Sequence, residues 1–132
     1  MNRIVVRYAD GRMIKGTTGD FAPTKEAFHV AVMDAPLNTR PVRVEVRDLK
    51  AVFFVKNFAG RPDYRPRQEF DPARPVLGRK IKVVFKDGEL LVGTTQGYTP
   101  GRPGFFMTPA DADSNIERCF VVAASTQDIT FL

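Results

Sequence analysis

The sequence has one cysteine, Cys119, and one histidine, His29, and no apolar run approaches the length that crosses a bilayer. A lone cysteine excludes an internal disulfide framework and a cysteine-ligated metal site. Met1 and two polar residues lead straight into a predicted strand, so no signal peptide is expected. These absences predict a soluble protein of a reducing, cytoplasmic compartment that makes no contact with a membrane.

Catalytic chemistry also lacks the residues that it would need. Because His29 alternates with the apolar residues Phe28 and Val30, it is expected to face solvent rather than to act as a general base. No serine–histidine–acid set can be built around it without a further orienting partner. Asp111 and Asp113 lie in a polar stretch, where solvated loop acids are favoured over a weak cation site. The sequence therefore predicts a protein that is not an enzyme and holds no cofactor or metal ion.

What the chain does contain is an internal repeat, in which residues 3–55 align without a gap on residues 80–132. Unrelated sequences of this length would share about three identical pairs. Fourteen pairs are identical: Ile4/Ile81, Val6/Val83, Asp10/Asp87, Gly11/Gly88, Gly16/Gly93, Thr17/Thr94, Thr18/Thr95, Pro23/Pro100, Phe28/Phe105, Asp34/Asp111, Ala35/Ala112, Asn38/Asn115, Val44/Val121 and Phe54/Phe131. The repeat indicates two copies of one small domain. The alternative is a single large sheet with accidental similarity.

Each copy begins with a predicted hairpin. In the first copy, apolar and polar residues alternate over 3–9, which predicts a half-buried strand, and residues 12–18 form the return strand. Asp10 and Gly11 between them predict a type I′ turn, because glycine accepts the positive φ that this turn needs. Gly16 lies inside the return strand and predicts a bulge or a sharp bend.

Three more short strands are expected in each copy. The positions expected to face the core of the first copy are Phe28, Val30 and Val32, then Val42, Val44 and Val46, then Val52 and Phe54. A helix across 24–33 is the competing interpretation, but the alternation favours a strand. A five-stranded sheet of this size closes best as a small barrel, which also removes its edges. We therefore predict an all-β protein with a barrel over 1–55, a linker over 56–79 and a second barrel over 80–132.

The outer face of the predicted fourth strand differs between the copies. The first copy has Arg43, Glu45 and Arg47 there, a solvated face, whereas the second has Phe120, Val122 and Ala124. An apolar outer face is expected to be covered, either by the linker or by a neighbouring barrel. Phe120 and Val122 are therefore candidate interaction residues.

The linker, residues 56–79, has four prolines and two glycines, which argues against a helix or a central strand. Its aromatic residues, Phe58, Tyr64 and Phe70, are evenly spaced and predict an ordered segment that lies across a barrel. It also carries six basic and three acidic groups, and the net charge of +5 permits an acidic partner. The candidate nucleic-acid-binding or ligand-binding residues are Arg61, Tyr64, Arg65, Arg67, Phe70 and Arg74.

A known pattern resembles the first copy. The stretch 10–21 reads Asp-Gly-Arg, three residues, Gly, and later Phe, which is similar to the first signature of Sm-like barrels. Val46-Arg47-Asp48 stands where the second signature has an apolar residue, Arg and Gly. The resemblance, which is weaker over the second copy, implies two tandem five-stranded Sm-like barrels. Sm-like neighbours associate strand four to strand five, a contact that here could form within the chain or between chains.

Other features depart from this family or resemble different ones. Ala22 and Glu26 stand where Sm-like proteins place the Asp and Asn that bind RNA, so family-type RNA binding is not implied. The Gly-Phe-Phe stretch of the second copy is similar to uncharacterised barrel domains attached to bacterial signalling and pilus-related proteins, which implies a bacterial source. Arg61 and Arg65, just before a barrel, resemble the arginine pair with which PilZ domains clamp cyclic di-GMP.

The sequence thus predicts a non-catalytic binding or adaptor module that acts through protein–protein interaction, with a protein partner or a further copy of the chain. RNA or DNA binding through the basic linker and barrel surface is the alternative, because guanidinium groups alternate with aromatic rings there. Binding of cyclic di-GMP by a divergent PilZ-like arginine motif is a second alternative.

Overall fold

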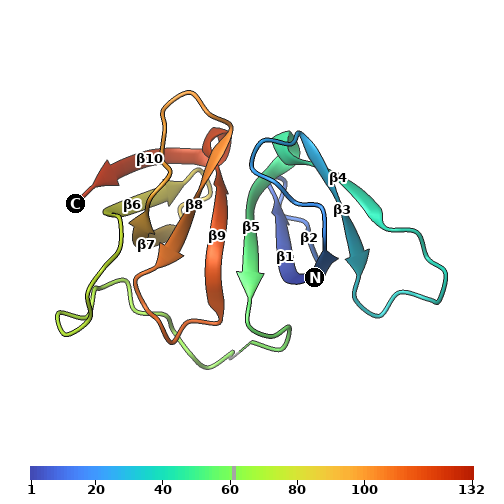
Figure 1. The fold of residues 1–132 in the computed structure, drawn as a ribbon, viewed down its shortest axis with the longest axis horizontal. Coiled ribbons are helices and arrows are strands. Elements are labelled where there is room, and N and C mark those ends of the chain that lie inside the picture. Colours follow the sequence, from blue (N-terminus) through green and yellow to red (C-terminus); the bar gives the residue numbers. More distant parts are fainter. Residues whose placement is uncertain (61) are drawn as a thin grey trace.

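The computed structural model describes residues 1–60 and 62–132, and it is all-β, as predicted (Figure 1). The strands form one antiparallel sheet in the order β10-β6-β7-β8-β9-β5-β1-β2-β3-β4. Their bounds are β1 (Asn2–Tyr8), β2 (Met13–Thr18), β3 (Ala27–Val32), β4 (Val42–Glu45), β5 (Leu49–Val55), β6 (Arg79–Phe85), β7 (Leu90–Thr95), β8 (Gly104–Pro109), β9 (Ile116–Val122) and β10 (Thr126–Phe131). The helix considered across 24–33 is therefore wrong.

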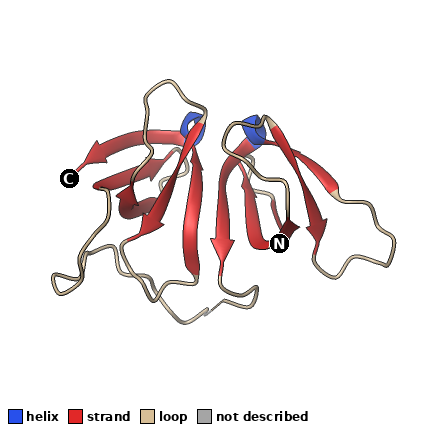
Figure 2. Ribbon diagram, in the orientation of Figure 1, coloured by secondary structure: helices blue, strands red, loops and turns tan. Residues whose placement is uncertain are grey.

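Helical structure in the described residues is confined to two short 3-10 turns, η1 (Val46–Asp48) and η2 (Ala123–Ser125), which Figure 2 shows in blue. Each turn lies between the fourth and fifth strands of its repeat. Neither these turns nor any other part of the described chain supplies a helix that could span a bilayer.

The first five strands and the last five strands form two blocks, called here the first half (residues 2–55) and the second half (residues 79–131). In each half the fifth strand pairs with the first, and the second, third and fourth follow in order. The halves meet where β9 pairs antiparallel with β5, with Phe120 opposite Val52. Figure 1 shows β5 and β9 side by side in the middle of the molecule, while β4 and β10 lie far apart.

The two hairpin turns have the same geometry, but it is not the predicted one. The N–H of Gly11 donates to the carbonyl of Tyr8 at 3.1 Å, and the N–H of Gly88 donates to Phe85 at 2.9 Å. Gly11 has a φ of 96° and Gly88 has a φ of 92°, whereas φ is not positive at Asp10. A type I′ turn needs positive φ at both central residues, so each turn is instead a three-residue loop that ends in a left-handed glycine.

A second pair of glycines permits close approach between strands. A Cβ added to Gly16 would lie 2.2 Å from the carbonyl oxygen of Ala31, and one added to Gly93 would lie 2.0 Å from that of Thr108. Pairing with the first strand continues without a shift through both positions, so of the two predicted alternatives, a bulge or a sharp bend, the bulge is wrong. Glycine is needed because the third strand of each half passes too close for any side chain.

Two hydrophobic cores lie side by side and share their central strands. Successive residues of β5 alternate between them: Val52 and Phe54 belong to the first-half core, whereas Ala51, Phe53 and Val55 belong to the second-half core. The alternation in β9 is reciprocal, with Cys119 and Val121 in the second-half core and Phe120 and Val122 in the first. Each half therefore completes the interior of the other.

The shared strands explain why aligned residues differ in burial. Cys119 is fully buried, which raises the pKa of its thiol, while the aligned Val42 is 40% exposed. Val44 and Val46 are buried as predicted. Val42 differs from its copy because β4 ends the sheet, whereas β9 is followed by β5.

Candidate functional site

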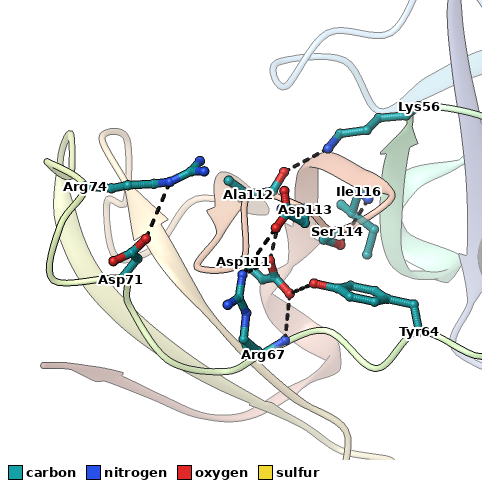
Figure 3. A network of polar contacts seen from close by, with 10 residues as sticks. All are labelled: Lys56, Tyr64, Arg67, Asp71, Arg74, Asp111, Ala112, Asp113, Ser114 and Ile116. Atoms are coloured by element: carbon teal, nitrogen blue, oxygen red, sulfur yellow. Dashed lines mark hydrogen bonds and ion pairs between the residues drawn. The ribbon is translucent and has the colours of Figure 1, made fainter.

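The linker is anchored to the second half by a buried carboxylate, that of Asp111 in the loop between β8 and β9 (Figure 3). Asp111 accepts hydrogen bonds from the Tyr64 hydroxyl, from the backbone N–H of Arg67 at 2.9 Å and from Nη2 of Arg67 at 3.2 Å. Burial alone would raise the pKa of Asp111, but these donors outweigh it and hold the pKa well below the ordinary 3.8. The prediction of a solvated loop acid is wrong for Asp111.

Further contacts tie the linker to both halves. The Gln68 side-chain oxygen accepts a hydrogen bond from the N–H of Val92 at 2.9 Å. The side-chain amide of Asn115 donates to the carbonyl of Asn57 at 2.9 Å and accepts from its N–H at 3.2 Å. On the other side, Nζ of Lys15 donates to the carbonyl of Phe58 at 3.1 Å. These bonds fix the path of the linker along the sheet.

The structure separates the candidate arginines of the linker. Arg67 forms ion pairs with Asp111 and Asp113 at 3.2 and 3.3 Å. Arg74 lies 3.6 Å from Asp71, and both side chains are largely exposed (Figure 3). Arg65 is exposed, and Arg61 lies outside the described residues. The cationic character expected of this segment is thus partly neutralised by the chain itself.

The candidate aromatic residues are half-buried. The Tyr64 hydroxyl is bonded to Asp111, and Nζ of Lys80 lies 4.8 Å above the ring of Phe70. In the described part of the chain, no phenylalanine or tyrosine is among the exposed large side chains. A nucleic-acid base would therefore need to displace packing before it could stack on a ring.

The remaining candidate residues, Phe120 and Val122, are 1% and 2% exposed in the first-half core. Phe120 packs edge-on against Phe21 and Phe106, with ring centroids 5.2 and 5.3 Å apart. Their apolar face is covered within the chain, by the neighbouring half. Ala124, which the sequence placed on the same face, is exposed in η2.

An open groove with a volume of about 620 Å³ lies beside the anchored linker. The linker lines it with Phe70, Arg74, Val76 and Leu77, among others. Val76 is 42% exposed and Leu77 is 76% exposed. Sequence reasoning could have found this apolar side of the groove, because two adjacent apolar residues are unexpected in a proline-rich, basic and solvated linker.

The opposite side of the groove comes from β7, β8 and β9. It includes Thr94, Phe106, Thr108 and Arg118. Thr94 and Thr108 face each other across the β7–β8 pair, and Phe106 is two residues away on β8. Sequence reasoning missed Phe106 and Arg118, because only the folded sheet brings them to the same surface as the linker.

Arg118 has an unusual environment for an exposed cation. Its guanidinium carbon lies 4.3 Å from the ring centre of Phe54 and 4.5 Å from that of Phe106. No aspartate or glutamate in the described part of the chain forms an ion pair with it. Two aromatic rings therefore restrain the guanidinium group while its charge stays uncompensated.

A nearly buried lysine also joins the halves. Nζ of Lys50, at the start of β5, lies 2.7 Å from Asp87 and 2.5 Å from Glu89 in the hairpin turn of the second half. The hydrogen bond from Lys50 lowers the pKa of Asp87. The Lys50 side chain is 10% exposed, whereas the two carboxylates are about half exposed. This cluster links β5 of the first half to the hairpin turn of the second half.

His29 is exposed, as predicted, and Nδ1 lies 2.8 Å from Asp20. The backbone N–H of His29 donates to the same carboxylate at 2.9 Å, and this bond is the main cause that lowers the pKa of Asp20 to about 2. His29 lies outside the groove. Within the described ranges, no three His, Cys, Asp or Glu side chains are grouped to hold a metal ion.

Comparison with known proteins matches the chain to a family model. No curated protein and no solved structure matches it. The model of a family of unknown function, DUF6982, matches residues 1–132. Because that match covers both halves and the linker, the chain belongs to the DUF6982 family.

Proposed function

We propose that the chain is a pair of Sm-like barrels produced by duplication, residues 1–55 and 80–132, joined by the linker 56–79. The same strand order in both halves supports this. So does the burial of matched positions, since Ile4 and Ile81 are both fully buried and Phe28 and Phe105 are 1% and 4% exposed. The β5–β9 pair joins a fourth strand to a fifth strand, which is the neighbour contact that the resemblance implies.

The function that the geometry supports best is non-catalytic protein binding, as an adaptor. One observation carries this proposal. Beside a linker whose Arg67 and Arg74 already meet the chain's own carboxylates, an apolar groove stays open to solvent. Concave, largely apolar surfaces with a few polar groups are the usual sites of ligand recognition, and apolar grooves are also used to receive segments of partner proteins. Such a surface suits side chains of a protein partner better than the repeated phosphates of a nucleic acid.

Nucleic-acid binding is the second candidate, and the exposed cations favour it. Arg65 and Arg118 are exposed, and the net charge of the chain is +5. These groups could contact phosphates, and such binding would weaken steeply with salt. Binding of cyclic di-GMP would use Arg65 with Arg61, which lies outside the described residues.

Measurements on the purified protein at low salt distinguish these candidate functions. Protein binding predicts an ultraviolet spectrum free of nucleic acid, no retardation of RNA or DNA, and no thermal shift with cyclic di-GMP. It also predicts that a captured partner stays bound at fixed stoichiometry after nuclease treatment and a high-salt wash. Co-eluting nucleic acid that salt removes would overturn the proposal. A thermal shift with cyclic di-GMP that Arg65→Ala abolishes would overturn it as well.

A further inference from the structure

We propose that the groove between the linker and strands β7 to β9 receives an extended peptide that carries a carboxylate among apolar side chains. The inference rests on the proposed protein-binding function and specifies the chemistry of the partner. Three properties of the groove lead to it: an apolar wall left in solvent, an excess of guanidinium groups, and a floor of hydroxyl groups.

The linker wall supplies the apolar surface. Leu77 is 76% exposed and Val76 is 42% exposed, and both belong to the linker whose earlier residues Arg67 and Gln68 are hydrogen-bonded to the second half. Burial of such apolar side chains is favourable in proportion to the apolar area removed from water. Met107 and Pro109 of β8 line the same groove. Apolar side chains of a peptide that lay along this wall would remove Leu77 and Val76 from water.

The charged residues of the groove predict an acidic group on the occupant. Arg74, Arg118 and Asp71 are its charged lining residues, so cations exceed anions. Arg118 is restrained over Phe54 and Phe106 and has no carboxylate partner in the described chain. A guanidinium group binds a carboxylate through two parallel hydrogen bonds, and one that is already restrained loses less entropy on binding. Arg118 is therefore the anchor for the carboxylate.

Arg74 can add a second contact. Its only ion pair in the described chain is with Asp71 at 3.6 Å, and the two side chains are 62% and 47% exposed. An exposed pair of this kind contributes little stability, so Arg74 can exchange Asp71 for an incoming carboxylate at small cost. The net charge of +5 on the whole chain would also speed the approach of an acidic peptide.

The floor favours a peptide over a nucleic acid. The hydroxyl groups of Thr94 and Thr108 can donate to or accept from the amides of an extended backbone. The ring of Phe106 is packed against Phe54 and Phe120 and carries Arg118 above it. Because that ring is occupied, bases have no free stacking platform here.

Phage-displayed random peptides panned against the purified full-length chain provide the test. We expect the enriched peptides to combine an acidic residue with flanking apolar residues. A fluorescent synthetic copy of the enriched peptide then gives affinities by anisotropy. Arg118→Gln and Leu77→Ser are each expected to weaken binding about tenfold, the loss of one charge-assisted contact or one buried apolar side chain.

Matched controls lie outside the groove. Arg47→Gln removes an exposed guanidinium group in η1, and Leu37→Ser removes a leucine that is 95% exposed. Both should leave the affinity unchanged. Because Arg118 and Leu77 are exposed, their variants should keep the melting temperature of the wild type. If Arg118→Gln fails to fold, Leu77→Ser decides the outcome.

Other results would contradict the peptide site, the protein-binding function, or both. Enriched peptides without acidic residues would overturn the peptide site, and so would wild-type affinity in both Arg118→Gln and Leu77→Ser. Displacement of the bound peptide by a short RNA, if added salt abolished that displacement, would also overturn the peptide site. A partner protein that binds the wild type, Arg118→Gln and Leu77→Ser equally would leave the protein-binding function standing without this groove. If no peptide is enriched and no partner is captured, both proposals fail.

Discussion

Replacement of Phe120 by alanine tests whether the two halves share their interiors. Phe120 belongs to β9 of the second half, but its side chain is 1% exposed inside the first-half core. Its ring contacts Phe21 and Phe106 edge-on at centroid distances of 5.2 and 5.3 Å. The substitution removes a large side chain where the two halves meet and leaves a cavity in the first-half core.

The expected loss follows from the size of this side chain. Truncation of a buried phenylalanine to alanine costs about 3–5 kcal/mol, from lost transfer free energy and from the cavity. The aligned residue of the first half, Arg43, is exposed on β4 and forms an ion pair with Glu45 at 2.9 Å. Arg43→Ala should therefore change stability by less than about 0.5 kcal/mol. The side chains at this one repeat position should therefore contribute very differently to the free energy of unfolding in the two halves.

Urea unfolding followed by circular dichroism measures both variants. The wild type should unfold in a single transition, and Phe120→Ala should move the midpoint of the whole transition downwards. A loss below about 1 kcal/mol would contradict the shared core, because a solvated phenylalanine would give that result. Two separate wild-type transitions, one of them unaffected by Phe120→Ala, would also refute the reasoning.

Three further predictions concern single contacts. Asp111→Asn should lower the free energy of unfolding by about 1–3 kcal/mol at neutral pH. Because the pKa of Asp111 in the folded protein lies below 3.8, its carboxylate stabilises the fold fully above about pH 4 and loses this effect as the pH falls further. Urea unfolding repeated in acid should therefore show a smaller difference in stability between the variant and the wild type. Lys50→Met should cost at most about 1 kcal/mol, because its acidic partners stay half-hydrated and methionine fills the stem's volume, and it should remove part of the salt dependence of unfolding. Gly93→Ala should lower the melting temperature strongly, because the added Cβ would meet the backbone of Thr108. Gly97→Ala, whose added Cβ would have nothing within 4 Å, should leave the melting temperature nearly unchanged. Equal effects of the two substitutions in calorimetry would count against the close approach of β8.

Strand positions were predictable because they depend on local periodicity. Phe28 and Val30 alternate with polar or small residues, and β3 spans Ala27–Val32 with both side chains buried. The turn type was not predictable from Asp10 and Gly11 alone, because the same pair fits both a two-residue and a three-residue loop. Burial at the end of the sheet also depends on neighbours that sequence does not name, which is why Val42 is exposed and Cys119 is not.

The site was harder to predict, because its members come together only through the folded linker. The apolar residues Phe120 and Val122 correctly indicated that β9 is covered on its outer face, although the sequence left open what covers it. Asp111 gave no sign of burial, since its donors, Tyr64 and Arg67, are more than forty positions away. Arg118 was also missed, because its aromatic contacts lie on another strand and in the other half.

The exchange of residues between β5 and β9 has a consequence for how such a protein can be divided or recombined. A fragment that ended at Val55 would expose the side chains of Ala51 and Phe53, which are buried in the intact chain. The complementary fragment would expose Phe120 and Val122. Such fragments should be insoluble when produced singly and soluble when co-expressed. The two halves therefore depend on each other for folding, and genetic exchange that replaced only one of them would have to preserve the residues of the β5–β9 contact.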